Sequence, residues 1–241
     1  MDLDDILEQQ KDGMSLEMKK AMLDAERQYE DARKPPSYAR PHIHAMGHFR
    51  HGTARRLDRS DRQTLEDAYD DWYEGLSFME RHSVRTYTDE AYRNINRMRR
   101  GTGEKWLGLN RTYDRNLYRS LEKSEIPMDM VVYRGTDQRA LGRLMMLIPD
   151  AMISKQFTEK AYTSASTDVR VASNSSFRGN LLLVIDVPKG TKGAYLNPIS
   201  QHKEDEILLQ AGTTFTIRDY DISNEKRLVL HVEVTGQEKE T

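Results

Sequence analysis

Two glutamates separated by one residue, Glu204 and Glu206, stand directly before an apolar run in the stretch HKEDEILLQAGTTF. Side chains alternate along a β-strand, so residues two apart point to the same face and lie about 6–7 Å from each other. Two carboxylates that close repel, and the repulsion raises the pKa of one of them unless a cationic or hydroxyl-rich ligand lies across both. The pair therefore indicates either acid/base chemistry or a charged strand entry that faces water.

Two other groups of polar residues stand in strand-like stretches before the glutamates. Arg134 ends the apolar run MVVYR, just before Gly135, and its guanidinium fork suits a phosphate or a carboxylate. Ser164 and Ser166 alternate in AYTSAST, so their hydroxyls share one face of a short strand. Each signal has an ordinary alternative, because such an arginine can form a structural ion pair and strand serines often bond to the backbone.

Composition excludes several kinds of site and partner. The 241 residues include no cysteine, which rules out disulfides, thiolate zinc ligands and a cysteine nucleophile. With 37 basic and 39 acidic residues, no global charge would draw the chain to nucleic acid or to a membrane. The N-terminus lacks the apolar segment of a secretory signal, and no stretch approaches the ~18 apolar residues of a membrane span. We expect synthesis in the cytoplasm, no membrane partner, and a signal-independent route for any delivery into a target cell.

The order of predicted elements indicates an α+β fold with the sheet in the C-terminal half. Residues 2–33 indicate a charged helix, and a segment rich in proline, glycine, histidine and arginine follows it. We therefore expect a charged helical extension and linker over residues 1–59 and one domain over residues 60–241.

The first helix of this domain is predicted to begin near residue 60. Apolar residues recur at helical spacing from Leu65 to Leu76, which predicts one apolar face. Ser60 and Gln63, three residues apart, predict a capping box at its start.

Two more helices are predicted before the strands. One covers residues 89–100, with Tyr92 and Ile95 facing inward, and the other covers residues 105–123. The later helix is predicted to turn Leu109, Tyr113, Leu117 and Leu121 inward.

After Pro127 the pattern changes to short β-type runs bounded by turn residues. Helices followed by strands are typical of an α+β fold. The predicted strands are MVVYR, NLLLVIDV, EILLQ, TTFTIRDY and KRLVLHVEV.

The order of the polar motifs resembles the pattern of the ADP-ribosyltransferase toxin family. That pattern is an arginine on a first strand, a Ser-Thr-Ser stretch on a second strand, and a Glu-x-Glu pair before a third. The matching residues are Tyr133-Arg134-Gly135, Tyr162-Thr163-Ser164-Ala165-Ser166 and Glu204-Asp205-Glu206. The resemblance spans residues 60–235 and implies N-terminal helices packed on a two-sheet mixed β core.

Further stretches resemble actin-modifying binary toxin enzymatic domains. VRTYTDEAYRNINRMRRG is similar to the helix that lines the nicotinamide pocket, with Tyr87, Tyr92 and Asn96 at the tyrosine, tyrosine and asparagine positions. GAYLNPISQHKEDEILLQAGTTF is similar to the loop that leads into the catalytic strand. In SNSSFRGN, Phe177 and Arg178 correspond to residues that contact nicotinamide and phosphate, although relatives often separate the two.

The resemblance implies an enzyme that transfers ADP-ribose from NAD to an arginine of a target protein and also hydrolyses NAD. Glu206 would bond the ribose 2′-hydroxyl and stabilise the oxocarbenium-like centre. Ser164 would hold Glu206 in place, and Arg134 would anchor the phosphate and ribose side of NAD. The backbone of Gly135 would bond the nicotinamide amide.

The resemblance also gives Glu204 a role toward the acceptor, because glutamate at this place in the family goes with transfer to arginine. A carboxylate can orient a guanidinium bidentately and take up the released proton. Asp205, between the two glutamates, is expected to point to the opposite face of the strand and to be solvated.

The linker leaves three alternatives open. Clustered histidines can bind zinc, although their spacing fits no short helical pair. The arginines could form a basic arm for nucleic acid, as in an ADP-ribosyltransferase that modifies a DNA or RNA base. A solvated linker, or one that docks a delivery or immunity partner, is the third alternative. The residues are His42, His44, His48, His51, Arg40, Arg50, Arg55, Arg56, Arg59 and Arg62.

A degenerate domain that only binds a ligand is disfavoured, because every catalytic residue of the pattern is present. The resemblance implies no metal.

Overall fold

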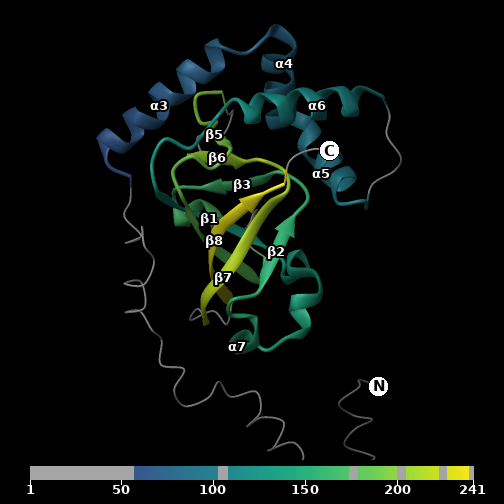
Figure 1. The fold of residues 1–241 in the computed structure, drawn as a ribbon, viewed down its shortest axis with the longest axis vertical. Coiled ribbons are helices and arrows are strands. Elements are labelled where there is room, and N and C mark those ends of the chain that lie inside the picture. The colour runs from purple at the N-terminus through teal and green to yellow at the C-terminus, as the bar shows by residue number, and fades with distance from the viewer. Residues whose placement is uncertain (1–56, 103–107, 174–178, 200–204, 223–226, 239–241) are drawn as a thin grey trace, which may run out of the picture. The chain divides into compact units, whose positions relative to one another are not determined.

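The computed structural model describes residues 57–238 with gaps at 103–107, 174–178, 200–204 and 223–226. Figure 1 shows that the long helices of this part come first along the chain and the strands follow, which confirms the predicted α+β class. The charged helix expected over 2–33 and the linker before residue 57 lie outside the described residues. The boundary near residue 59 stays a prediction.

The helical part precedes the first strand. It contains α3 (Arg59–Glu74), α4 (Phe78–Thr86), the π-helical segment η2 (Tyr87–Ala91), α5 (Tyr92–Arg99) and α6 (Gly108–Glu122). No helix in the described part of the chain is long and apolar enough to cross a membrane.

A capping box opens α3, two residues earlier than the sequence pattern predicts. The side chains of Asp58 and Asp61 each accept a hydrogen bond from the backbone N–H of the other, at 2.9 and 3.1 Å. The predicted box of Ser60 and Gln63 is therefore wrong, because an earlier aspartate caps as well as a serine and starts the helix sooner. The apolar face is confirmed, since Leu65 is buried together with the other core residues of this helix.

The helix predicted over 89–100 is split by a π-helical turn. The five residues of η2 separate α4 from α5, and a π-turn shifts the phase of the side chains that follow it. Ile95 is buried as predicted, but Tyr92 is 39% exposed and Tyr87 is buried instead. The inward prediction for Tyr92 is wrong because of this shift.

The inward face of α6 is confirmed except at its start. Leu117 and Leu121 are buried, whereas Leu109 is 70% exposed. Contact with the core begins one turn after Leu109, at Tyr113, which packs against the hydrophobic cluster that contains Leu117 and Leu121.

Eight strands of the described part form one hydrogen-bonded series in the order β2-β7-β8-β4-β1-β3-β6-β5. Only the β4–β8 pair is parallel within this series, so the sheet is mixed. The expected division into two sheets is not confirmed, although one backbone pair alone, Tyr133 with Ser166, joins β1 to β3. The strands are β1 (Met130–Thr136), β2 (Gln156–Glu159), β3 (Thr163–Ser166), β4 (Leu181–Val187), β5 (Gly193–Tyr195), β6 (Glu206–Leu209), β7 (Thr213–Ile222) and β8 (Leu228–Gln237).

Strands β2 and β5 were not predicted, because four and three residues are too few to display a pattern. Short helices also lie between the strands. They are η3 (Gln138–Met146), α7 (Pro149–Met152) and α8 (Val169–Ala172).

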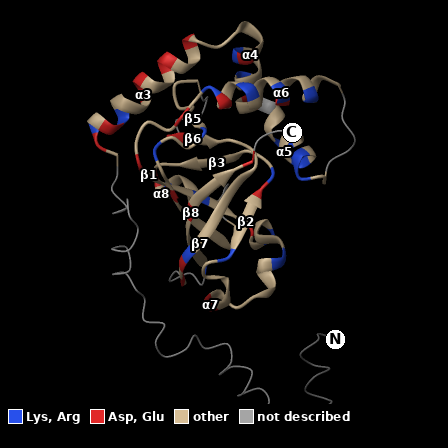
Figure 2. Cartoon of the chain, in the orientation of Figure 1, with Lys and Arg blue, Asp and Glu red and all other residues tan. Residues whose placement is uncertain are grey.

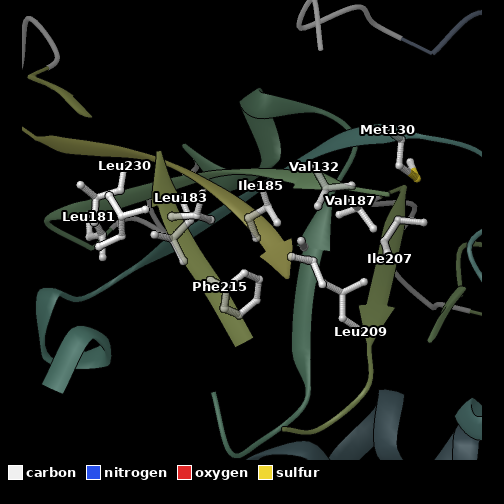
Figure 3. Packing of buried hydrophobic residues seen from close by; sticks show 14 of the residues in the cluster. Met130, Val132, Leu181, Leu183, Ile185, Val187, Ile207, Leu209, Phe215 and Leu230 are labelled. Atoms are coloured by element: carbon white, nitrogen blue, oxygen red, sulfur yellow. The ribbon is translucent and has the colours of Figure 1, made fainter. Parts of the chain in front are cut away.

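Two hydrophobic clusters lie on the two faces of β6. Ile207 and Leu209 point into the first cluster, which Figure 3 shows packed among strands β1, β4, β7 and β8. Leu208 points to the other face, into a cluster shared with the helices. Burial on both faces explains why this strand reads as a continuous apolar run. Trp72 of α3 also donates a 2.8 Å hydrogen bond to the carbonyl of Ser120, which ties α3 to α6.

A close backbone approach at Gly179 sets how the chain enters β4. A Cβ added there would lie 1.8 Å from the carbonyl oxygen of Thr136, at the end of β1. Gly179→Ala should therefore force a backbone shift and lower the free energy of unfolding by about 1–3 kcal/mol. Urea denaturation followed by circular dichroism measures this change.

Gly108→Ala is the matched control, because a Cβ added at the start of α6 meets no atom within 4 Å. This variant should keep the wild-type free energy of unfolding or raise it slightly. A Gly179→Ala protein as stable as the Gly108→Ala protein would contradict the close approach.

Candidate active site

Strands β1 and β3 separate directly after their single shared pair, and the candidate site lies where they separate. β1 continues its pairing with β4 as far as Thr136, and β3 continues its pairing with β6. Between β1 and β3 no further ladder forms. The guanidinium of Arg134 instead donates from Nη1 to the carbonyl oxygen of Ser164. A side chain thus replaces the backbone contact that a continued ladder would have made.

Ser164 also contacts the glutamate that begins β6. Its backbone partner in the ladder is Leu208, so Glu206, two residues away, is its diagonal neighbour on the same face. The Ser164 hydroxyl donates to Glu206 Oε1 at 2.6 Å. The structure therefore brings Arg134, Ser164 and Glu206 together around one serine.

Charged groups surround the Arg134 guanidinium. Burial lowers its pKa, the nearby Glu159 raises it, and Arg100 lowers it, with smaller upward effects from Tyr87 and Glu206. Arg100 and Glu159 form a two-bonded ion pair at 2.8 and 3.0 Å. The sequence did not predict this pair, because its members lie 59 residues apart. The one available signal was the position of Arg100 at the end of a predicted helix.

Tyr87 and Asn96 lie together on the helical side of the site. The Asn96 side-chain amide donates to the Tyr87 hydroxyl at 3.0 Å across nine residues. In a straight α-helix such residues would stand about 13 Å apart along the axis and half a turn out of phase. The contact therefore depends on the π-helical segment between them.

The charges of Glu206 and Arg134 also affect the pKa of Tyr87. Burial raises the pKa of its hydroxyl, the Asn96 hydrogen bond lowers it, Glu206 raises it and Arg134 lowers it. Its ring centroid lies 6.5 Å from that of Tyr92 and 5.3 Å from that of Tyr162, both edge-on. Tyr92 is the most exposed of these aromatic residues, so it stands at the rim of the group.

A buried polar group fastens β3 to the helices behind the site. The Tyr162 hydroxyl donates to the backbone oxygen and to Oδ1 of Asp114 on α6, at 3.1 and 3.0 Å. Arg99 of α5 donates to the same carboxylate and lies 4.9 Å from the centroid of the Tyr162 ring. The sequence motif included Tyr162, but nothing in the sequence pointed to Arg99 or Asp114 as its partners.

Asp205 is not the solvated residue that strand alternation predicts. Its carboxylate accepts two 2.7 Å hydrogen bonds from Arg62. The prediction is wrong because Asp205 precedes β6 and has a positive φ of 47°, so strand alternation does not apply to it. Arg62 is correspondingly a residue of α3 with a fixed partner, and is not part of a linker.

Several predicted site residues are outside this geometry. Gly135 lies in β1, where it pairs with Leu182 of β4. Glu204, Phe177 and Arg178 lie outside the described residues, as do the four clustered histidines. Within the part of the chain that is described, no group of three or more histidine, aspartate or glutamate side chains could hold a metal ion.

A comparison with models of protein families decides the family. The model of the ADP-ribosyltransferase exoenzymes matches residues 65–237, the region that contains Tyr87, Arg134, Ser164 and Glu206. The chain belongs to the ADP-ribosyltransferase exoenzyme family.

Two curated proteins are similar to this exoenzyme family member. The NAD(+)--arginine ADP-ribosyltransferase EFV of Enterococcus faecalis is 28% identical over 177 residues, which cover 68% of this chain and 34% of that protein. The epidermal cell differentiation inhibitor of Staphylococcus aureus is 29% identical over 91 residues, which cover 36% of this chain and 35% of that protein. The chain thus spans about a third of the length of the curated relatives it matches.

Solved structures of ADP-ribosyltransferase toxins share the fold. Plx2a, an ADP-ribosyltransferase toxin from Paenibacillus larvae, aligns with a TM-score of 0.63 at 23% identity over 73% of this chain and 96% of that chain. C3stau2 from S. aureus, crystallised with NAD, aligns with a TM-score of 0.60 at 19% identity over 75% of this chain and 97% of that chain. At such identities the likeness concerns the fold alone.

Proposed function

We propose that this chain is a mono-ADP-ribosyltransferase that transfers ADP-ribose from NAD to an arginine of a target protein and hydrolyses NAD at a lower rate. The observation that supports it most is the 2.6 Å hydrogen bond between Ser164 and Glu206, formed on the residue whose carbonyl accepts from Arg134. A carboxylate held this way has few rotamers open to it, which is what a group that must face a developing charge needs.

Glu206 is proposed to act on the ribose. The reaction breaks the bond between the nicotinamide nitrogen and C1′ of the ribose, the electron pair leaves with nicotinamide, and positive charge develops on the ribose. The Glu206 carboxylate would bond the 2′-hydroxyl and stabilise this charge. A nitrogen of the acceptor guanidinium then forms the new bond to C1′ and loses a proton.

Arg134 is proposed to bind the diphosphate side of NAD. A guanidinium has five N–H donors, and the hydrogen bond to Ser164 is the one that Arg134 makes with other described residues. Its remaining donors, on a side chain whose pKa is lowered by burial, suit a phosphate oxygen. NAD therefore fits the residues present.

The nicotinamide would bind beside the helical aromatic group. We assign this role to Tyr87, Tyr92 and Asn96, which the π-helical segment brings together. The Gly135 backbone is proposed to bond the amide. Phe177 and Arg178 are proposed to contact the nicotinamide and a phosphate of NAD, and this assignment rests on the sequence resemblance.

Glu204 is proposed to orient the acceptor guanidinium and to receive its proton. The support is the sequence spacing to Glu206, together with the similarity to a protein named as an NAD(+)--arginine ADP-ribosyltransferase.

A nucleic acid is the second candidate acceptor, and a row of arginines on α6 favours it. Arg111, Arg115 and Arg119 recur every four residues on the exposed side of the helix, and Figure 2 shows the basic residues along α6 in contrast to the acidic α3. Like charges at this spacing repel, and none of the three has an ion pair with a described residue. Phosphates could offset that repulsion.

Glu206→Gln tests the proposed chemistry directly. The amide keeps an oxygen that can accept from Ser164 but loses the charge that faces the ribose cation. Release of nicotinamide from NAD should fall by about 10²–10³-fold or more, with the circular dichroism spectrum and melting temperature close to those of the unmodified protein. Glu74→Gln is the control, because Glu74 is an exposed residue of α3, and this variant should retain full activity. Near-normal turnover by Glu206→Gln would refute the mechanism.

Glu204→Gln separates the two candidate acceptors. With an arginine acceptor, transfer to agmatine should fall by about 10²-fold or more while slow NAD hydrolysis persists, because water needs no second carboxylate to orient it. The measurement follows labelled NAD into agmatine, protein and nucleic acid. If the unmodified enzyme leaves agmatine unlabelled, and the label resists protease but is released by nuclease, then the acceptor is a nucleic acid and not an arginine.

A further inference from the structure

Asp205 has all of its polar groups bonded, although it lies between the two glutamates of the motif. Its carboxylate accepts from Arg62 Nη1 and Nη2 at 2.7 Å each and from the Tyr195 hydroxyl at 3.0 Å. Its backbone N–H donates to Asn197 Oδ1 at 3.2 Å, and its carbonyl accepts from the Thr167 N–H at 3.1 Å. Three separate parts of the chain therefore hold this one residue: α3, the end of β5 with the residues after it, and the turn after β3.

The backbone at Asp205 is in the left-handed region, with φ of 47°. Residues other than glycine adopt this conformation at a cost, and aspartate tolerates it better than most. The bonds to the carboxylate hold the residue in a conformation that a free chain would seldom adopt. The ion pair and its companion hydrogen bonds thus favour this conformation of the turn.

This turn determines where β6 begins. Glu206 is the first residue of β6, and its carbonyl accepts a 2.8 Å hydrogen bond from Leu196. A rotation of the Asp205 backbone would move the Glu206 Cα and with it the carboxylate that Ser164 contacts. The direction of the Glu206 side chain thus depends on a contact made by α3, far earlier in the sequence.

We propose that Arg62 is a positioning residue that, through its bidentate ion pair with Asp205, holds Glu206 in its catalytic orientation. The inference rests on the proposed function, in which Glu206 faces the ribose cation. Arg62 touches neither NAD nor the acceptor in this account, and Asp205 transmits its effect. Asp205 lies within the region that the family model matches, and Arg62 lies three residues before that region.

A purely structural ion pair would behave differently. The Arg62 side chain is 36% exposed, and partly exposed ion pairs contribute little to stability. Loss of the ion pair between Arg62 and Asp205 should therefore hardly change the melting temperature. A positioning role instead predicts a lower kcat with nearly unchanged NAD affinity, because the interaction of Glu206 matters mainly in the transition state.

The test compares Arg62→Ala, Asp205→Gly and the double variant in nicotinamide release from NAD, with calorimetry for NAD affinity. Glycine at 205 keeps the left-handed backbone available and removes only the carboxylate. We expect each single variant to lower kcat by about 10–100-fold with NAD affinity within about twofold. The double variant should be no slower than the slower single variant, because both changes break one interaction. Arg62→Lys should recover part of the activity, since it keeps the charge without the fork.

Arg59→Ala is the control, an exposed arginine on the same turn of α3, and it should leave kcat unchanged. Unchanged kcat in Arg62→Ala and Asp205→Gly, or multiplied losses in the double variant, would overturn the proposal.

Amide hydrogen exchange tests the same inference without catalysis. In Arg62→Ala, but not in Arg59→Ala, the amides of Thr167 and Asp205 should exchange at least about tenfold faster, because the turn that pairs them loses its anchor. Unmodified protein that cleaves no NAD would contradict the proposed function, whereas unchanged exchange at these amides would contradict the positioning role itself.

Discussion

The site depends on one constraint, the separation of β1 from β3 after a single backbone pair at Tyr133 and Ser166. Each strand remains fully paired on its other side, β1 with β4 and β3 with β6. The separation leaves backbone groups of β3 without a strand partner on this side, and buried groups of that kind need another bond. The guanidinium of Arg134 provides it at the carbonyl of Ser164.

Ser164 thereby connects the two charges that the proposed chemistry needs. Its carbonyl accepts from the Arg134 guanidinium and its hydroxyl donates to the Glu206 carboxylate, so both charged groups are held by the same residue. The nearby carboxylates of Glu159 and Glu206 limit the cost of placing the Arg134 guanidinium in a partly buried position, whereas Arg100 adds to that cost. The buried side chains on both faces of β6 keep this arrangement rigid.

The sequence predicted the fold class, most of the strands and the order of the motifs, because long apolar runs and repeated spacings are local signals. The errors at Tyr92 and Asp205 have local causes too: a π-turn and a left-handed residue each change the phase of the side chains, and neither has a composition signal. The contact of Arg62 with Asp205 could not be predicted from local patterns, because the two residues lie 143 positions apart in the sequence. Sequence periodicity locates a side chain on its own element and says nothing about which distant element meets it.

A double-mutant cycle in nicotinamide release tests most directly the proposal that Ser164 acts by holding Glu206. Ser164→Ala and Glu206→Gln are made singly and together, and kcat is measured for all four proteins. We expect Ser164→Ala to slow the unmodified enzyme by about 10-fold or more but to have little further effect in the Glu206→Gln background, since that variant has no carboxylate to hold. Independent effects, with the two losses multiplying in the double variant, would contradict it.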